Sequence, residues 1–148
     1  MKPKHSRQGG MLGKAMVAVF ALSPAMAFSD DTDYTVRERV SAGLNVAGAA
    51  QNLVTDNMRK SSADYSRGWT SQELSGLNFY LHSIRIDPET GVITINYTEQ
   101  AKKVSISLTP SAGGEGLAAG KTPMEDISWR CTVSDPSDNK YVPDHCRM

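Results

Sequence analysis

The spacing of apolar residues divides this chain into a helical first part and a strand-rich second part. Between residues 33 and 60 apolar positions recur three, four or seven residues apart, on one face of a helix: Val36, Val40, Leu44, Ala47, Val54 and Met58. Thr35 and Glu38 have capping-box spacing, and acidic residues precede them, as helix N-termini favour. We predict one amphipathic helix over residues 33–60 and a polar loop over residues 61–76.

Beyond this loop, apolar and polar residues alternate in short segments typical of half-buried antiparallel strands. Four such strands are predicted, over residues 77–86, 92–98, 104–109 and 126–133. A turn containing Pro88 and Gly91 joins the first two, and a loop rich in Gly and Pro separates the last two. The sequence therefore predicts an α+β domain, with one N-terminal helix packed on a roughly four-stranded antiparallel sheet.

The first 27 residues have the pattern of a targeting segment. Residues 1–14 are basic, and the apolar run over residues 15–28 is shorter than the about 20 residues that a spanning helix needs. The run contains Pro24 and then the small residues Ala25 and Ala27. This order predicts a secretory signal cut after Ala27, with residues 28–148 forming the exported globular domain.

Two cysteines, Cys131 and Cys146, are the only ones in the chain, and a turn-rich segment lies between them. In an exported protein this pair predicts one disulfide that closes a loop near the C-terminus. Such a loop contributes about 3 kcal/mol in the chain-entropy model. We expect it to be rigid, exposed and outside the core, and therefore suited to contact with a partner. The residues expected to make that contact are Lys140, Tyr141, Asp144 and His145.

The charge balance argues against nucleic acid as the main partner. The whole chain has a formal net charge of zero, and residues 28–148 hold 12 basic and 16 acidic residues, a formal net charge of −4. Binding to phosphates needs clustered Lys and Arg instead.

Residue patterns give little support to catalysis or cofactor binding. The stretch Gly116–Thr122 resembles a phosphate loop, but Glu115 stands where the motif needs glycine and Pro123 follows directly. No G-x-S-x-G occurs, and the three histidines do not converge with other metal ligands in the sequence. We expect a non-enzymatic protein without a metal or cofactor. Trp129 shares a strand face with Ile127 and Val133, which favours a place in the core.

Four pieces of the chain, in order, resemble the globular part of type IV pilins from Gram-negative bacteria. They are residues 33–44 (DYTVRERVSAGL), residues 92–97 (VITINY), residues 104–110 (VSISLTP) and the C-terminal set Trp129-x-Cys131 with Lys140-Tyr141-x-Pro143-x-x-Cys146. The resemblance covers about residues 33–147. It implies a helix packed on an antiparallel sheet, a disulfide-bounded loop exposed for adhesion or subunit contact, and a filament at the bacterial cell surface.

The N-terminus departs from the pilin pattern and leaves two processing sites open. Pilins keep an unbroken apolar helix of about 25 residues, whereas Lys14 and Pro24 interrupt the corresponding segment. Cleavage after Gly10, as in prepilin leaders, would retain the apolar segment. Cleavage after Ala27 would instead release a soluble periplasmic domain.

Three functions therefore follow as hypotheses. The first is a pilin-like structural or adhesive protein at the cell surface, which contacts pilin subunits or a receptor through the disulfide loop. The second is a soluble periplasmic modulator of pilus assembly that binds pilins without joining the filament. The third, a secreted enzyme or small-ligand protein, lacks a catalytic constellation in the sequence.

Overall fold

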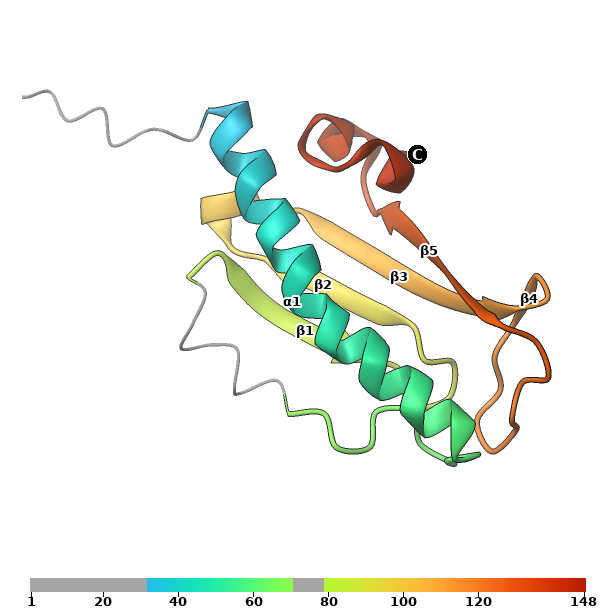
Figure 1. Ribbon diagram of the computed structural model, residues 1–148. Coiled ribbons are helices and arrows are strands. Elements are labelled where there is room, and N and C mark those ends of the chain that lie inside the picture. Colours follow the sequence, from blue (N-terminus) through green and yellow to red (C-terminus); the bar gives the residue numbers. More distant parts are fainter. Residues whose placement is uncertain (1–31, 71–78) are drawn as a thin grey trace, which may run out of the picture.

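The computed structural model describes residues 32–70 and 79–148 (Figure 1). The long helix α1 (Asp33–Arg59) is followed by the strands β1 (Leu81–Ile86), β2 (Ile93–Tyr97), β3 (Ser105–Ala112), β4 (Glu115–Gly116) and β5 (Ile127–Val133). Three short 3-10 helices complete the described part: η2 (Glu99–Ala101), η3 (Pro136–Tyr141) and η4 (Asp144–Cys146). This architecture confirms the predicted α+β fold.

Helix α1 begins at a threonine cap. The side chain of Thr32 accepts a hydrogen bond of 3.2 Å from the backbone N–H of Thr35, which satisfies one of the unpaired N–H groups of the first turn. The capping residue is thus Thr32. Thr35, where the sequence predicts the start of a capping box, lies inside the first turn of the helix. Within residues 32–70 and 79–148, no helix has the length and apolarity that a membrane crossing requires.

The sheet is antiparallel throughout, with β1, β2, β3 and β5 side by side and β4 paired to the end of β3. Strand β3 continues to Ala112, whereas the sequence predicted a loop from residue 110. Its last residues stay in the sheet because they pair with the first half of β5, where Pro110 lies opposite Trp129. Since β2 ends opposite Leu108, the missing N–H of Pro110 leaves no gap in the β2–β3 ladder.

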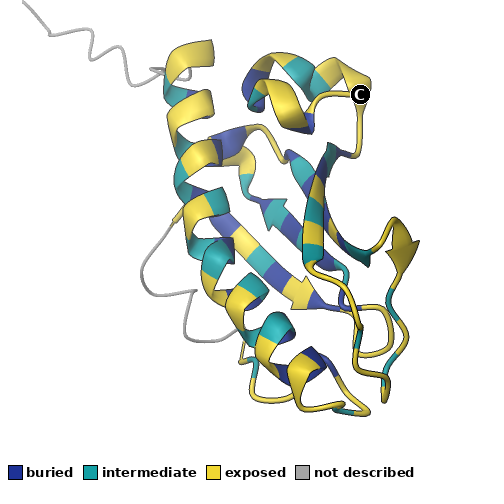
Figure 2. Ribbon diagram, turned by 45° about the vertical axis from the view of Figure 1, so that its right-hand side comes forward, coloured by how far each residue is buried: buried dark blue, intermediate teal, exposed yellow. Residues whose placement is uncertain are grey.

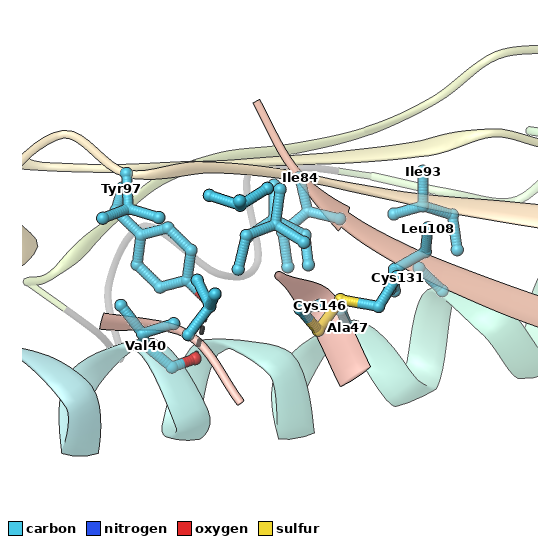
Figure 3. Close-up of a cluster of buried hydrophobic side chains, with 14 of the residues drawn as sticks. Val40, Ala47, Ile84, Ile93, Tyr97, Leu108, Cys131 and Cys146 are labelled. Atoms are coloured by element: carbon cyan, nitrogen blue, oxygen red, sulfur yellow. Dashed lines mark hydrogen bonds between the residues drawn. A yellow bond between two sulfur atoms is a disulfide. The ribbon is translucent and has the colours of Figure 1, made fainter. Parts of the chain in front are cut away.

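The hydrophobic core lies between α1 and the inner face of the sheet (Figures 1 and 3). Five of the six helix positions predicted to share an apolar face are fully buried, and Leu44 is half-buried. The sheet contributes the alternate residues of its strands, among them Ile84, Ile93, Ile95, Tyr97, Ile106 and Val133. The burial of one side chain in two along the strands is what the alternating pattern predicts.

The loop that follows α1 is held against the helix by one buried amide. Asn57 is 7 % exposed, and its Nδ2 donates to the carbonyl oxygens of Tyr65 at 3.0 Å and Arg67 at 2.9 Å. Tyr65 is itself buried, and its hydroxyl donates to the carbonyl oxygen of Ala118 at 2.6 Å. Residues 61–70 therefore form a fixed loop, and residues 71–76 of the predicted loop lie outside the described residues.

Candidate partner-binding site

The segment after β5 folds back over the end of the domain and is fixed by the predicted disulfide. Cys131 on β5 is bonded to Cys146 in η4, with a Cα–Cα distance of 4.6 Å. Both cysteines are buried, at 8 % and 0 % exposure, and the bond is drawn among the core side chains in Figure 3. The disulfide therefore joins the last strand to the C-terminal segment, residues 134–148.

Local sequence explains why this segment forms short helices rather than an irregular loop. The side chain of Asp135 accepts a hydrogen bond of 2.9 Å from the backbone N–H of Ser137, which caps η3, and Pro136 occupies the first turn. The same hydrogen bond lowers the pKa of the Asp135 carboxyl. The turn predicted at residues 135–139 is thus the start of a capped 3-10 helix.

The segment is partly core, contrary to the expectation that it lies outside it. Tyr141 and Val142 are only 8 % and 2 % exposed. They are buried because η3 packs against α1. The segment therefore has an inner side that packs on the domain and an outer side that faces solvent (Figure 2).

Lys140 connects the segment to the start of α1. Its ammonium lies 3.5 Å from a carboxylate oxygen of Asp33 and 4.8 Å from the ring centre of Tyr141. A hydrogen bond with the Tyr141 side chain and then the charge of Asp33 raise the pKa of Lys140. Both charged side chains are more than half exposed, so the pair adds little stability. Asp33 was not among the predicted site residues, because nothing in the sequence marks a contact between opposite ends of the domain.

Asp144 and His145 lie on the exposed side of the segment. The Asp144 carboxylate forms an ion pair of 2.8 Å with Arg147. Arg147 in turn donates to the carbonyl oxygen of Asn139 at 3.0 Å, and the side chain of Asn139 exchanges two hydrogen bonds with the backbone of Met148. Asn139 and Arg147 thus fix the outer surface, although no motif in the sequence marks either residue.

The four predicted contact residues therefore take different places. Lys140, Asp144 and His145 are exposed, whereas Tyr141 is buried beneath Lys140. We call the exposed side chains Lys140, Asp144, His145 and Arg147 the C-terminal patch. His145 also lines a hollow of about 350 Å³ that reaches Leu44 of α1 and Trp129 of β5. Trp129 is half-buried at this hollow. The prediction that it lies in the core is therefore only partly correct.

The structure argues against a metal site at the cysteines and against a phosphate loop at Gly116–Thr122. The ligand atoms of Cys131, His145 and Cys146 lie within 4.8 Å of one another, but the two sulfurs are bonded to each other, so neither is a thiolate ligand. The glycine-containing stretch Gly116–Thr122 leads into β5 rather than a helix, so it lacks the helix N-terminus that a phosphate loop uses. The processing residues Gly10, Ala25 and Ala27 lie outside the described residues.

Comparison with known proteins agrees with this arrangement. The family model for Pilin, a protein of bacterial filaments, matches residues 36–147. A curated relative, fimbrial protein EcpC of Eikenella corrodens, is 26 % identical over an alignment of 138 residues, and the match covers 89 % of this chain and 84 % of that protein. No solved structure matches the chain significantly. With the helix on its antiparallel sheet and the disulfide-bonded C-terminal segment in place, we conclude that this chain belongs to the pilin family of structural filament proteins.

Proposed function

We propose that this protein is a non-enzymatic, exported subunit of a type IV pilus-like filament, and that it contacts its partners through the C-terminal patch. Membership of the pilin family supports the filament role. The partners would be other pilin subunits or a receptor at the surface of another cell.

The observation that carries the proposal is the preorganisation of the patch. The Cys131–Cys146 disulfide and the packing of η3 on α1 hold the segment in place. The patch side chains stay exposed while Tyr141 and Val142 anchor their backbone. A surface that is already ordered pays little conformational entropy when it binds, so the segment is suited to recognition.

A periplasmic modulator of pilus assembly is the second candidate. Lys14 and Pro24 interrupt the apolar segment ahead of α1, which favours cleavage after Ala27. The released domain would lack the apolar segment, and it would bind pilins through the same patch without entering the filament.

The mature N-terminus and the location of the protein separate these two functions. An epitope inserted at the exposed Gly113–Gly114 turn allows detection in sheared filaments and in the periplasm. A chain that begins at Met11 and is found in filaments supports the subunit. A chain that begins at Phe28 and stays in the periplasm supports the modulator. A cytoplasmic chain with an intact Met1 contradicts both.

Photo-crosslinking tests the patch itself. A photoreactive residue at position 145 is expected to capture pilin subunits or another envelope protein, while the same residue at the exposed position 82 on β1 serves as the matched control. Replacement of Cys131 and Cys146 by alanine is expected to abolish the cross-link at position 145. Equal cross-linking at positions 82 and 145 would contradict the role of the patch.

A further inference from the structure

Helix α1 covers only part of the inner face of the sheet. It packs on β1 and β2, and β5 lies beyond it (Figure 1). The second half of β5 is buried, at Cys131 and Val133, whereas Ile127 and Trp129 in its first half are only half-buried. The inner face of the sheet is therefore left open along the first half of β5.

Two hollows occupy the space between α1 and β5. One has a volume of about 350 Å³ and is lined by Leu44, Leu108, Trp129, Pro143 and His145, among others. The other, of about 400 Å³, lies between the end of α1 (Thr55 and Arg59), the loop residues 122–126, which include Glu125 and Asp126, and the start of β5 (Ile127 and Trp129). Because Trp129 lines both, the two hollows are neighbours along β5, and we call the two together the trough.

The outer edge of β5 is also open, unlike that of β1. The indole N–H of Trp69 donates to the carbonyl oxygen of Ile84 at 2.9 Å, so the loop after α1 occupies part of the β1 edge. Strand β5 pairs only with β3, and no group in residues 32–70 or 79–148 forms a hydrogen bond to its other side. The backbone groups of an edge strand that point outward are ready to pair with an added strand.

The side chains along β5 indicate what kind of strand would fit. Trp129 and Ile127 face the trough, and Ser128 and Arg130 face the opposite, exposed side. Arg130 has no ion-pair partner within the described residues. Cross-strand neighbours interact most favourably as apolar pairs and as opposite charges. The matching segment thus carries an apolar side chain beside Trp129 and a carboxylate beside Arg130.

We propose that β5 accepts an extended, acidic segment of a partner protein as an additional antiparallel strand. An apolar side chain of that segment fills the hollow beside Trp129, and a neighbouring Asp or Glu pairs with Arg130. The main-chain hydrogen bonds supply affinity and the two side chains supply specificity. This surface is separate from the C-terminal patch, apart from His145 at the end of the trough.

A second copy of this chain and a helix fit the surface less well. Antiparallel pairing of two β5 strands would place both Arg130 side chains on the same face near the symmetry axis, where like charges repel. A helix is about 10 Å across, so hollows of about 350 and 400 Å³ accept its side chains but not its body, and its backbone would leave the β5 edge unpaired. Charge and shape therefore favour a heterologous extended segment.

A synthetic peptide provides the test. The probe is the blocked heptapeptide Thr-Val-Glu-Phe-Glu-Val-Thr, whose apolar and acidic residues alternate, added to the isotopically labelled full chain with its disulfide intact. We expect saturable binding below 1 mM, with the largest amide shifts in β5 and cross-strand contacts to Ile127–Val133 in NMR spectra. A version of the peptide N-methylated at alternate residues on its pairing edge is expected not to bind, because it cannot form the ladder.

Charge exchange makes the test specific. Arg130→Glu is expected to weaken binding of the acidic peptide about tenfold, and a peptide with lysine in place of glutamate is expected to restore it. Arg85→Glu on β1 is the matched control, since it reverses an exposed arginine next to the occupied edge, and binding should be unchanged. No binding at 1 mM, equal binding by the N-methylated peptide, or equal effects of both arginine substitutions would overturn the proposal. Self-association that Arg130→Glu alters would assign the edge to a second copy and would also overturn it.

Discussion

The hydroxyl of Tyr97 on β2 donates a hydrogen bond of 2.6 Å to the carbonyl oxygen of Val40 in the first third of α1. The ring reaches the helix because Gly43, one turn further on, has no side chain. A Cβ atom built at Gly43 would overlap the ring of Tyr97. Gly43 therefore leaves the space that the Tyr97 ring occupies against the helix.

Gly43→Ala is expected to destabilise the domain even though alanine favours helices. The added methyl group must displace the Tyr97 ring, and overpacking of this kind costs about 1–3 kcal/mol. The matched control is Gly48→Ala on the same helix, since no atom outside its neighbours lies within 4 Å of the new Cβ. That control should stabilise the fold by about 0.5–1 kcal/mol. Urea denaturation of both variants measures the two effects, and equal shifts in the same direction would contradict the role of Gly43.

Tyr97→Phe should lower stability at neutral pH and change its dependence on alkaline pH. The loss of the buried hydroxyl removes a hydrogen bond worth about 0.5–1.5 kcal/mol. Burial, and to a lesser extent the charge of ionised Tyr80, raises the pKa of Tyr97 above its usual value of 10.0. Above pH 10 the unfolded chain therefore loses the proton of this tyrosine, while the folded chain keeps it. The contribution of Tyr97 to stability is thus fully present below pH 10 and is lost as the pH rises above 10.

Denaturation curves at several pH values from 8 to 11.5 measure this effect. Above pH 10 the stability of the natural chain should fall more steeply than that of Tyr97→Phe, by about 1.4 kcal/mol per pH unit. The raised pKa of Tyr65 is common to both proteins and cancels in the comparison. Parallel curves would show that Tyr97 ionises as readily in the folded state as in the unfolded chain.

Removal of the disulfide is expected to destabilise the whole domain. Replacing Cys131 and Cys146 together by alanine should lower the free energy of unfolding by about 2–5 kcal/mol, because the unfolded chain gains freedom and the segment loses its attachment to β5. Treatment of the natural chain with dithiothreitol should reproduce the loss, and the double variant should not respond to the reductant. An unchanged melting temperature after complete reduction would rule out this contribution.

Asn57→Asp tests how firmly the loop after α1 is held. The carboxylate would replace an amide that donates to two carbonyl oxygens, so a buried negative charge would face two acceptors. We expect a loss of about 1–3 kcal/mol, together with faster hydrogen exchange at residues 65–69. Asn52→Asp makes the same change at an exposed position of α1 and should cost little. Similar losses for the two variants would contradict the role of the Asn57 amide.

The local pattern was sufficient for the secondary structure wherever neighbours along the chain decide it. The helix starts at Asp33 as predicted, and the alternation in residues 92–98 and 104–109 identifies the inner face of β2 and β3. The two cysteines and their turn-rich spacing were enough for the disulfide. These features depend on periodicity and on short-range chemistry, which a sequence displays directly.

The tertiary structure alone decided features that depend on distant partners. Strand β3 extends through Pro110 because β5 lies beside it, and Tyr141 is buried because η3 packs on α1. Whether Trp129 lies in the core depends on how far α1 reaches across the sheet, and the helix stops short of β5. The sequence by itself determined which residues are apolar and therefore gain stability from burial. Only the relative placement of helix, strands and C-terminal segment decided which of them are covered, since burial is a property of the space between elements and not of a residue's neighbours in the chain.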